Sequence, residues 1–153
     1  MQRRQLLAAV GATATASLAG CPILGEDGEL TLDSPIAAVE AWHEAITEQD
    51  LDAVDMVLHS QSPLRPVEEP SEAAGDISVE TVDVAVVEEN LDESGVEEQL
   101  SGADVDSETI STFAAAENAV VEGQITISFG EESQTQQVRH FLAVEDGDWT
   151  LVV

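Results

Sequence analysis

The spacing of the hydrophobic residues changes about halfway along the chain. Ser34-Pro35 is a typical helix start, because serine can cap the first turn and proline needs no hydrogen bond there. The side chains that follow form an apolar stripe at helical spacing, with Trp42 at its edge: Ile36, Val39, His43 and Ile46. Asp50 can cap a second helix with its own stripe of Leu51, Val54, Val57 and Leu58. The pattern predicts two helices and then a loop over residues 60–76, which are rich in Pro, Ser, Glu and Gly.

After this loop the apolar residues alternate, as they do in β-strands with one buried face. The first strand is predicted from Val82, Val84 and Val86, and the clearest one from Val121, Ile125, Ile127 and Phe129. Gly123 falls on the apolar side of the latter strand, where it permits a bulge or a strong bend. A third strand follows a turn at residues 130–133 and contains Val138, His140, Leu142 and Val144.

The end of the chain predicts a hairpin. Asp146-Gly147 favours a type I′ turn, which leads into the alternating residues Trp149, Leu151 and Val153. Residues 91–116 are ambiguous, although Ile110, Phe113 and Ala114 indicate a short helix from about Ser107. Helices first and a bent antiparallel sheet afterwards predict a single α+β domain over residues 34–153.

The segment before this domain has the composition of an export signal. Residues 1–20 begin with a basic pair, continue with a short, weakly apolar stretch, and contain no acidic residue. The apolar stretch is shorter than the roughly 20 residues that a membrane-spanning helix needs. Arg3 and Arg4, followed by Gln-Leu-Leu, resemble the signal of the twin-arginine translocation pathway. We therefore expect a removable signal peptide.

The signal ends in a sequence that resembles the lipobox of prokaryotic lipoproteins: Leu18, Ala19, Gly20 and Cys21. Cys21 is the only cysteine of the chain, so it has no partner for an internal disulfide. We predict that Cys21 carries the lipid and that residues 22–33 form an acidic tether. The mature protein would then be held on the extracytoplasmic face of the cell membrane, with membrane lipid as its first partner.

Charge separates this chain from most soluble proteins. It has 32 acidic residues against four arginines and no lysine, and the formal net charge is −28. Such a balance excludes nucleic-acid binding, which needs Lys and Arg to neutralise phosphates. Acidic excess with a core of small residues resembles the proteins of salt-loving archaea, in which molar salt screens the repulsion. We interpret the charge as an adaptation to high salt.

No catalytic or metal motif is complete in the sequence. The acidic clusters at Asp104-x-Asp106-x-Glu108 and at residues 145–148 do not continue into a calcium loop. His43-Glu44 lacks the second histidine of a metalloprotease motif, and no nucleophile elbow is present. We therefore expect no metal, no cofactor and no catalytic residue of a recognisable class.

The order of elements resembles the cone-shaped domain of the nuclear-transport-factor-2-like superfamily. The resemblance lies in the opening residues 34–46, in Asp50-Leu51-Asp52-Ala53-Val54 and His59, and in the closing Asp146-Gly147-Asp148-Trp149. In particular, the chain resembles small lipoproteins of this type in haloarchaea. The resemblance implies a pocket between the long helix and the concave face of the sheet. Its implied lining residues are Trp42, His43 and His140.

Three functions remain open at this point. The leading prediction is a non-enzymatic domain that binds a small apolar ligand or an envelope protein. A second is a small-molecule isomerase or dehydratase that uses His43 or a buried carboxylate as base; the steroid-isomerase constellation is absent, because the chain has no tyrosine. A third is an accessory subunit of an envelope complex.

Overall fold

A computed structural model describes residues 32–68 and 77–153 of the chain. The elements are α1 (Pro35–Glu48), α2 (Leu51–Val57), β1 (Ile77–Glu89), α3 (Glu93–Gln99), α4 (Ser107–Ala115), β2 (Asn118–Phe129), β3 (Glu132–Glu145) and β4 (Asp148–Leu151). The strands form one antiparallel sheet in the order β1-β2-β3-β4. The predicted α+β class, with N-terminal helices packed on a curved antiparallel sheet, is confirmed.

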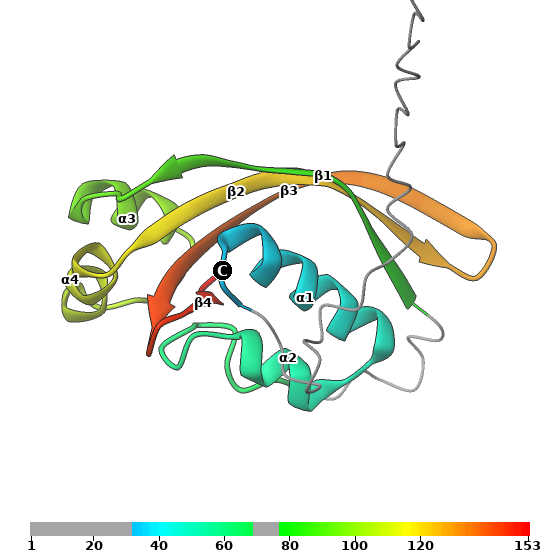
Figure 1. The fold of residues 1–153 in the computed structure, drawn as a ribbon, viewed down its shortest axis with the longest axis horizontal. Helices are drawn as coiled ribbons and strands as arrows, with labels where there is room; N and C mark the ends of the chain where they lie inside the picture. The colour runs from blue at the N-terminus through cyan, green and yellow to red at the C-terminus, as the bar shows by residue number, and fades with distance from the viewer. Residues whose placement is uncertain (1–31, 69–76) are drawn as a thin grey trace, which may run out of the picture.

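The sheet is bent, and α1 lies along its concave side with α2 beneath it (Figure 1). Both helices begin at the predicted caps: the side chain of Ser34 accepts from the backbone N–H of Ala37 at 3.2 Å, and that of Asp50 accepts from Ala53 at 3.1 Å. The α3 and α4 helices cover the other end of the sheet (Figure 1). The fold therefore has two apolar contact regions: Val121 and Leu142 pack with α1 and α2, whereas their sequence neighbours Val120 and Phe141 pack with α3 and α4.

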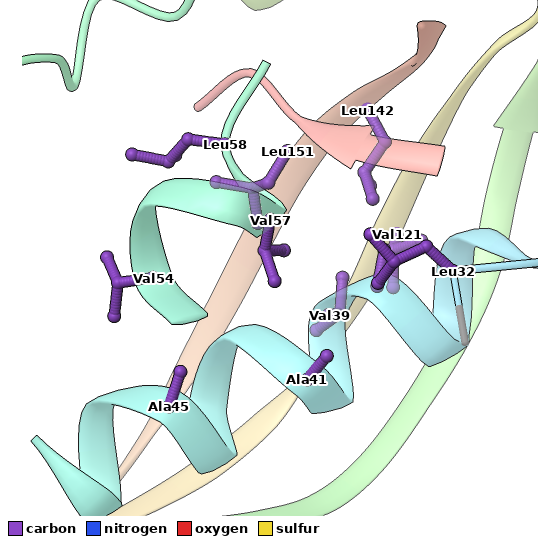
Figure 2. Close-up of a cluster of buried hydrophobic side chains, with 11 residues drawn as sticks. Leu32, Val39, Ala41, Ala45, Val54, Val57, Leu58, Val121, Leu142 and Leu151 are labelled. Atoms are coloured by element: carbon purple, nitrogen blue, oxygen red, sulfur yellow. The ribbon is translucent and has the colours of Figure 1, made fainter. Parts of the chain in front are cut away.

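The main core lies between α1, α2 and the concave face. Figure 2 shows its side chains converging from the two helices and the strands: Leu32, Val39, Ala41, Ala45, Val54, Val57, Leu58, Val121, Leu142 and Leu151. Leu32 is buried in this cluster, and its carbonyl accepts a hydrogen bond from the N–H of Trp149 at 2.8 Å. The folded domain therefore includes Leu32, which the sequence placed in the tether.

A second core lies under α3 and α4. It consists of Val96, Leu100, Phe113, Val120, Phe141, Ala143 and Val152. Asn118 fixes this layer, because its buried amide donates to the carbonyls of Leu91 and Phe113 and accepts from the N–H of Leu91. The helix predicted from Ser107 is confirmed as α4, whereas α3 fell in the stretch that the sequence left ambiguous.

The predicted inward position of Val82 is wrong. A β-bulge between Thr81 and Asp83 shifts the register of β1 against β2, and Val82 is 56% exposed. The bulge lies next to Gly123, which pairs with Val84 and where a Cβ atom would come within 2.2 Å of the Asp83 carbonyl oxygen. An irregularity is therefore present beside Gly123, as expected, but it is a bulge whose extra residue belongs to the neighbouring strand, β1.

The hairpin at the end of the chain follows the prediction. Asp146 and Gly147 have positive φ angles of 55° and 100°, as a type I′ turn requires, and they join Glu145 directly to its partner Asp148. Of the loop predicted over residues 60–76, residues 60–68 contain neither helix nor named strand, and residues 69–76 lie outside the described residues. Within the described ranges, no helix is long and apolar enough to cross a membrane.

Candidate functional site

An apolar pocket opens beside Trp42, at the C-terminal end of α1. It encloses about 200 Å³ and is lined by Trp42, Ala45, Ile46, Gln49, Leu51, Val54, Val67, Glu68 and Ile77. The left-handed conformation of Gln49, with φ at 55°, ends α1 and turns the chain into α2, so the two helices form two walls. Val67 and the first residue of β1 complete the lining. Glu68, an exposed residue, is the only ionisable group among these lining residues.

The two histidines singled out by the sequence meet in the interior. His43 projects from α1 and His140 from β3, and their ring centroids are 5.5 Å apart with the rings tilted by 57°. His43 is only 2% exposed, and its Nδ1 atom shares a hydrogen bond of 2.8 Å with the Thr81 hydroxyl. The other His43 nitrogen and both nitrogens of His140 are buried without a hydrogen-bond partner. Neither histidine lines the pocket beside Trp42.

Burial keeps both imidazoles neutral. Loss of solvent, with a smaller contribution from His140, lowers the pKa of His43 to about 4. Burial also lowers the pKa of His140; the nearby Val153 carbonyl opposes this shift without reaching hydrogen-bond geometry. At neutral pH the pair therefore consists of two uncharged rings in an apolar interior.

The third histidine occupies a different place. His59 packs edge-on against Phe113, and its Nδ1 accepts a hydrogen bond from the backbone N–H of Gln61. Burial lowers the pKa of His59, while Glu145, with a carboxylate oxygen 3.8 Å from Nδ1, acts in the opposite direction. Glu145 itself accepts from both the N–H and the hydroxyl of Ser60, so the serine is bound to the carboxylate and not to the histidine. This grouping ties the loop after α2 to the end of β3.

The arginines of the described residues serve the fold. Arg139 donates to Gln99, Glu88 and Glu122, which joins β1, β2 and β3 to α3. Arg65 donates to the Asp55 carboxylate and to backbone carbonyls of Asp55, Leu58 and His59. Since both guanidinium groups are committed to these contacts, neither presents an unpaired charge to an anion.

One of the acidic clusters has a structural role. The Asp106 side chain caps α4 by accepting a hydrogen bond from the N–H of Thr109 at 2.8 Å. Hydrogen bonding from Thr109 lowers the pKa of Asp106. Among the described residues, no three His, Cys, Asp or Glu side chains are grouped as ligands for one metal ion.

The structure therefore separates the three predicted pocket residues. Trp42 lines the apolar pocket, whereas His43 and His140 form a buried pair of their own. The Thr81 hydroxyl forms a hydrogen bond with His43 of this pair. The sequence pattern did not predict the inward position of Thr81, because the bulge at Val82 reverses which residues at the start of β1 face inward. The pocket residue Val67 lies within the loop expected over residues 60–76, and Ile77 directly follows that loop, so no periodic pattern could assign them. Arg3, Arg4, Leu18, Ala19, Gly20 and Cys21 lie outside the described residues.

Comparison with known proteins adds one structural likeness. No protein-family model matches the chain, and no curated protein sequence gives a significant match. The structure is similar to that of a protein from Thiobacillus denitrificans that is named as a calcium/calmodulin-dependent protein kinase type II association domain. The TM-score is 0.46 and the sequence identity 16%, over 81% of this chain and 94% of the other. A likeness at this level carries no functional argument.

Proposed function

We propose that this protein is an exported lipoprotein whose domain holds a small apolar ligand in the pocket beside Trp42. The pocket is the observation that carries the proposal. Its volume of about 200 Å³ lies below the roughly 300–1,000 Å³ typical of sites for drug-sized molecules. The site therefore suits a compact apolar molecule, or a single apolar group of a larger ligand or envelope protein.

The lining supports binding and not catalysis. General acid–base catalysis needs an acid or base and a hydrogen-bond donor that converge on the reacting atom. The lining of this pocket is apolar except at Gln49 and Glu68, and Glu68 is exposed. The alternative enzyme would use His43 or a buried carboxylate as its base. The imidazole of His43 lies outside the pocket and is a weak base with a pKa of about 4, and no Asp or Glu is buried among the described residues.

The proposed location follows from the sequence of the first 21 residues. Arg3 and Arg4 support export by the twin-arginine pathway, and Cys21 supports a lipid anchor on the extracytoplasmic face. Loss of the signal would leave 32 acidic residues against two arginines, so the mature domain would function in molar salt. A domain tethered there would meet apolar molecules that enter or leave the membrane.

A neutral fluorescent probe tests the pocket directly. N-phenyl-1-naphthylamine becomes bright in apolar surroundings and carries no charge that the acidic surface would repel. We expect saturable binding to the full-length protein at molar salt, and we expect Ala45→Phe to weaken it at least tenfold by filling the pocket. Ala115→Phe is the matched control, because Ala115 ends α4 at an exposed position.

Circular dichroism must show that both variants keep the fold. Probe binding that is equal in the wild type and in folded Ala45→Phe would refute the assignment of the ligand to this pocket. If Ala45→Phe unfolds, competition provides the second test: a short aliphatic alcohol should displace the probe from the wild type. Failure to do so would contradict a small apolar site.

A further inference from the structure

The buried histidines pose a chemical problem that the apolar pocket does not solve. Polar atoms in a protein interior almost always have partners, because a buried and unsatisfied group costs about 1–3 kcal/mol. Here Nε2 of His43 and both nitrogens of His140 have none, although the two rings are adjacent. A neutral imidazole with a free ring nitrogen is the commonest side-chain ligand for transition metals, and two such rings lie side by side here.

We propose that His43 and His140 together bind one transition metal ion of the class that prefers imidazole, with copper favoured. Metal–nitrogen bonds of about 2.0–2.1 Å place the centroids of two imidazoles on one ion roughly 4.5–6.5 Å apart, depending on the angle between the two bonds. The observed separation is 5.5 Å. The remaining coordination positions would be filled by water or another small ligand, because the two rings are the only protein ligands proposed.

Thr81 supports the assignment as a positioning residue. Histidines that bind metals nearly always donate their second ring N–H to an oxygen atom, which fixes the tautomer. Nδ1 of His43 lies 2.8 Å from the Thr81 hydroxyl oxygen. When Nδ1 is the donor, the lone pair resides on Nε2, which is the buried nitrogen without a partner. The bulge that turns Thr81 inward therefore supplies an oxygen atom to which Nδ1 can donate in the tautomer that a metal requires.

The surroundings favour an ion of low charge. No Asp or Glu side chain of the described residues makes a hydrogen bond or salt bridge with His43 or His140, so no acidic side chain there offsets the charge of a dication. Burying a charge without a compensating one is costly, and the cost rises with the charge. Copper is bound well by imidazole and is available as the monovalent Cu(I) ion, whereas zinc is always divalent.

The test measures metal binding by the full-length chain with Cys21→Ser, since a free thiol would itself bind copper. Cu(I) is supplied from a bicinchoninate buffer at molar salt, and Zn(II) serves as the second probe. We expect one Cu(I) per chain, and at least tenfold weaker binding in His43→Gln and in His140→Gln. Thr81→Val should lose about tenfold to a hundredfold in affinity, as substitutions beside metal ligands do.

His59→Asn is the matched control, because it removes the remaining histidine and keeps an acceptor for the N–H of Gln61. Its affinity should equal that of the parent protein. Zinc binding that depends on both His43 and His140 would support the site as well. The proposal is refuted if the parent retains neither metal, or if the folded variants retain both metals unchanged.

X-ray absorption on the loaded parent protein keeps the test valid if a variant fails to fold. The spectrum should show imidazole scattering from two rings. A spectrum with oxygen ligands alone would place the metal on surface carboxylates and contradict the proposal. The outcome is independent of probe binding beside Trp42, since neither histidine lines that pocket.

Discussion

At the scale of single residues, Asn118 joins the outer helical layer to the sheet. Its side chain is 1% exposed and makes hydrogen bonds to Leu91, Phe113 and Ala116, which belong to the segments around α3 and α4. No apolar side chain of this size can replace these contacts. We therefore regard Asn118 as the main polar contact of the second core.

Replacement of Asn118 by alanine should lower the free energy of unfolding by about 2–4 kcal/mol, because it leaves the buried Phe113 carbonyl and the partly buried backbone groups of Leu91 without this partner. Denaturant titration at constant salt measures the effect. Gln134→Ala, at an exposed position of β3, should change stability by less than about 0.5 kcal/mol. Equal stability of the two variants would show that water replaces the amide without cost.

Residue types alone could not predict how the histidines are used. The spacing of His43 on the stripe of α1 and of His140 on β3 correctly placed both side chains toward the interior. Their contact, and the hydrogen bond to Thr81, depend on the register of strands that are distant in sequence. Asn118 carried no signal either, because an isolated asparagine before a strand is indistinguishable from a turn residue.

At the scale of elements, the bulge in β1 and Gly123 in β2 form one feature. The extra residue brings the Asp83 carbonyl so close to Gly123 that a Cβ atom would overlap it, at 2.2 Å. The same irregularity exposes Val82 and turns Thr81 toward His43. The exposure of Val82, the close contact at Gly123 and the environment of the buried histidines therefore have a common origin.

Gly123→Ala should destabilise the domain by about 1–3 kcal/mol, since backbone must move to admit the methyl group. Thermal unfolding followed by circular dichroism measures this change. Gly102→Ala is the control, because a Cβ atom there meets nothing within 4 Å. A Gly123→Ala variant as stable as the control would mean that the bulge relaxes freely, and the common origin would be wrong.

Elements with strong periodicity and caps were predictable from the sequence, while irregular ones were not. Ser34-Pro35, Asp50 and Asp146-Gly147 are local signals with local physical causes, and each occupies its expected place. The α3 helix lacks an apolar stripe, as only Val96 of its residues is buried. The bulge at Val82 arises from pairing with β2, so alternation along β1 alone could not reveal it.

At the scale of the whole molecule, the charge and the proposed anchor define where the domain works. The chain carries a formal net charge of −28, and the arginines in its described part are engaged with neighbouring side chains or carbonyls. Neither feature would attach the protein to an anionic membrane surface. Attachment would therefore depend on the lipid at Cys21, and access of the Trp42 pocket to apolar ligands would depend on that attachment.

The most direct test of this account is the intact mass of the protein extracted from its native membrane at molar salt, compared with Cys21→Ser. The account predicts a chain that begins at Cys21 and carries a mass increment of diacyl type, which is absent from the variant. An unmodified chain that still begins at Met1 would contradict it, and the acidic domain would then have to be explained as a protein that is never exported.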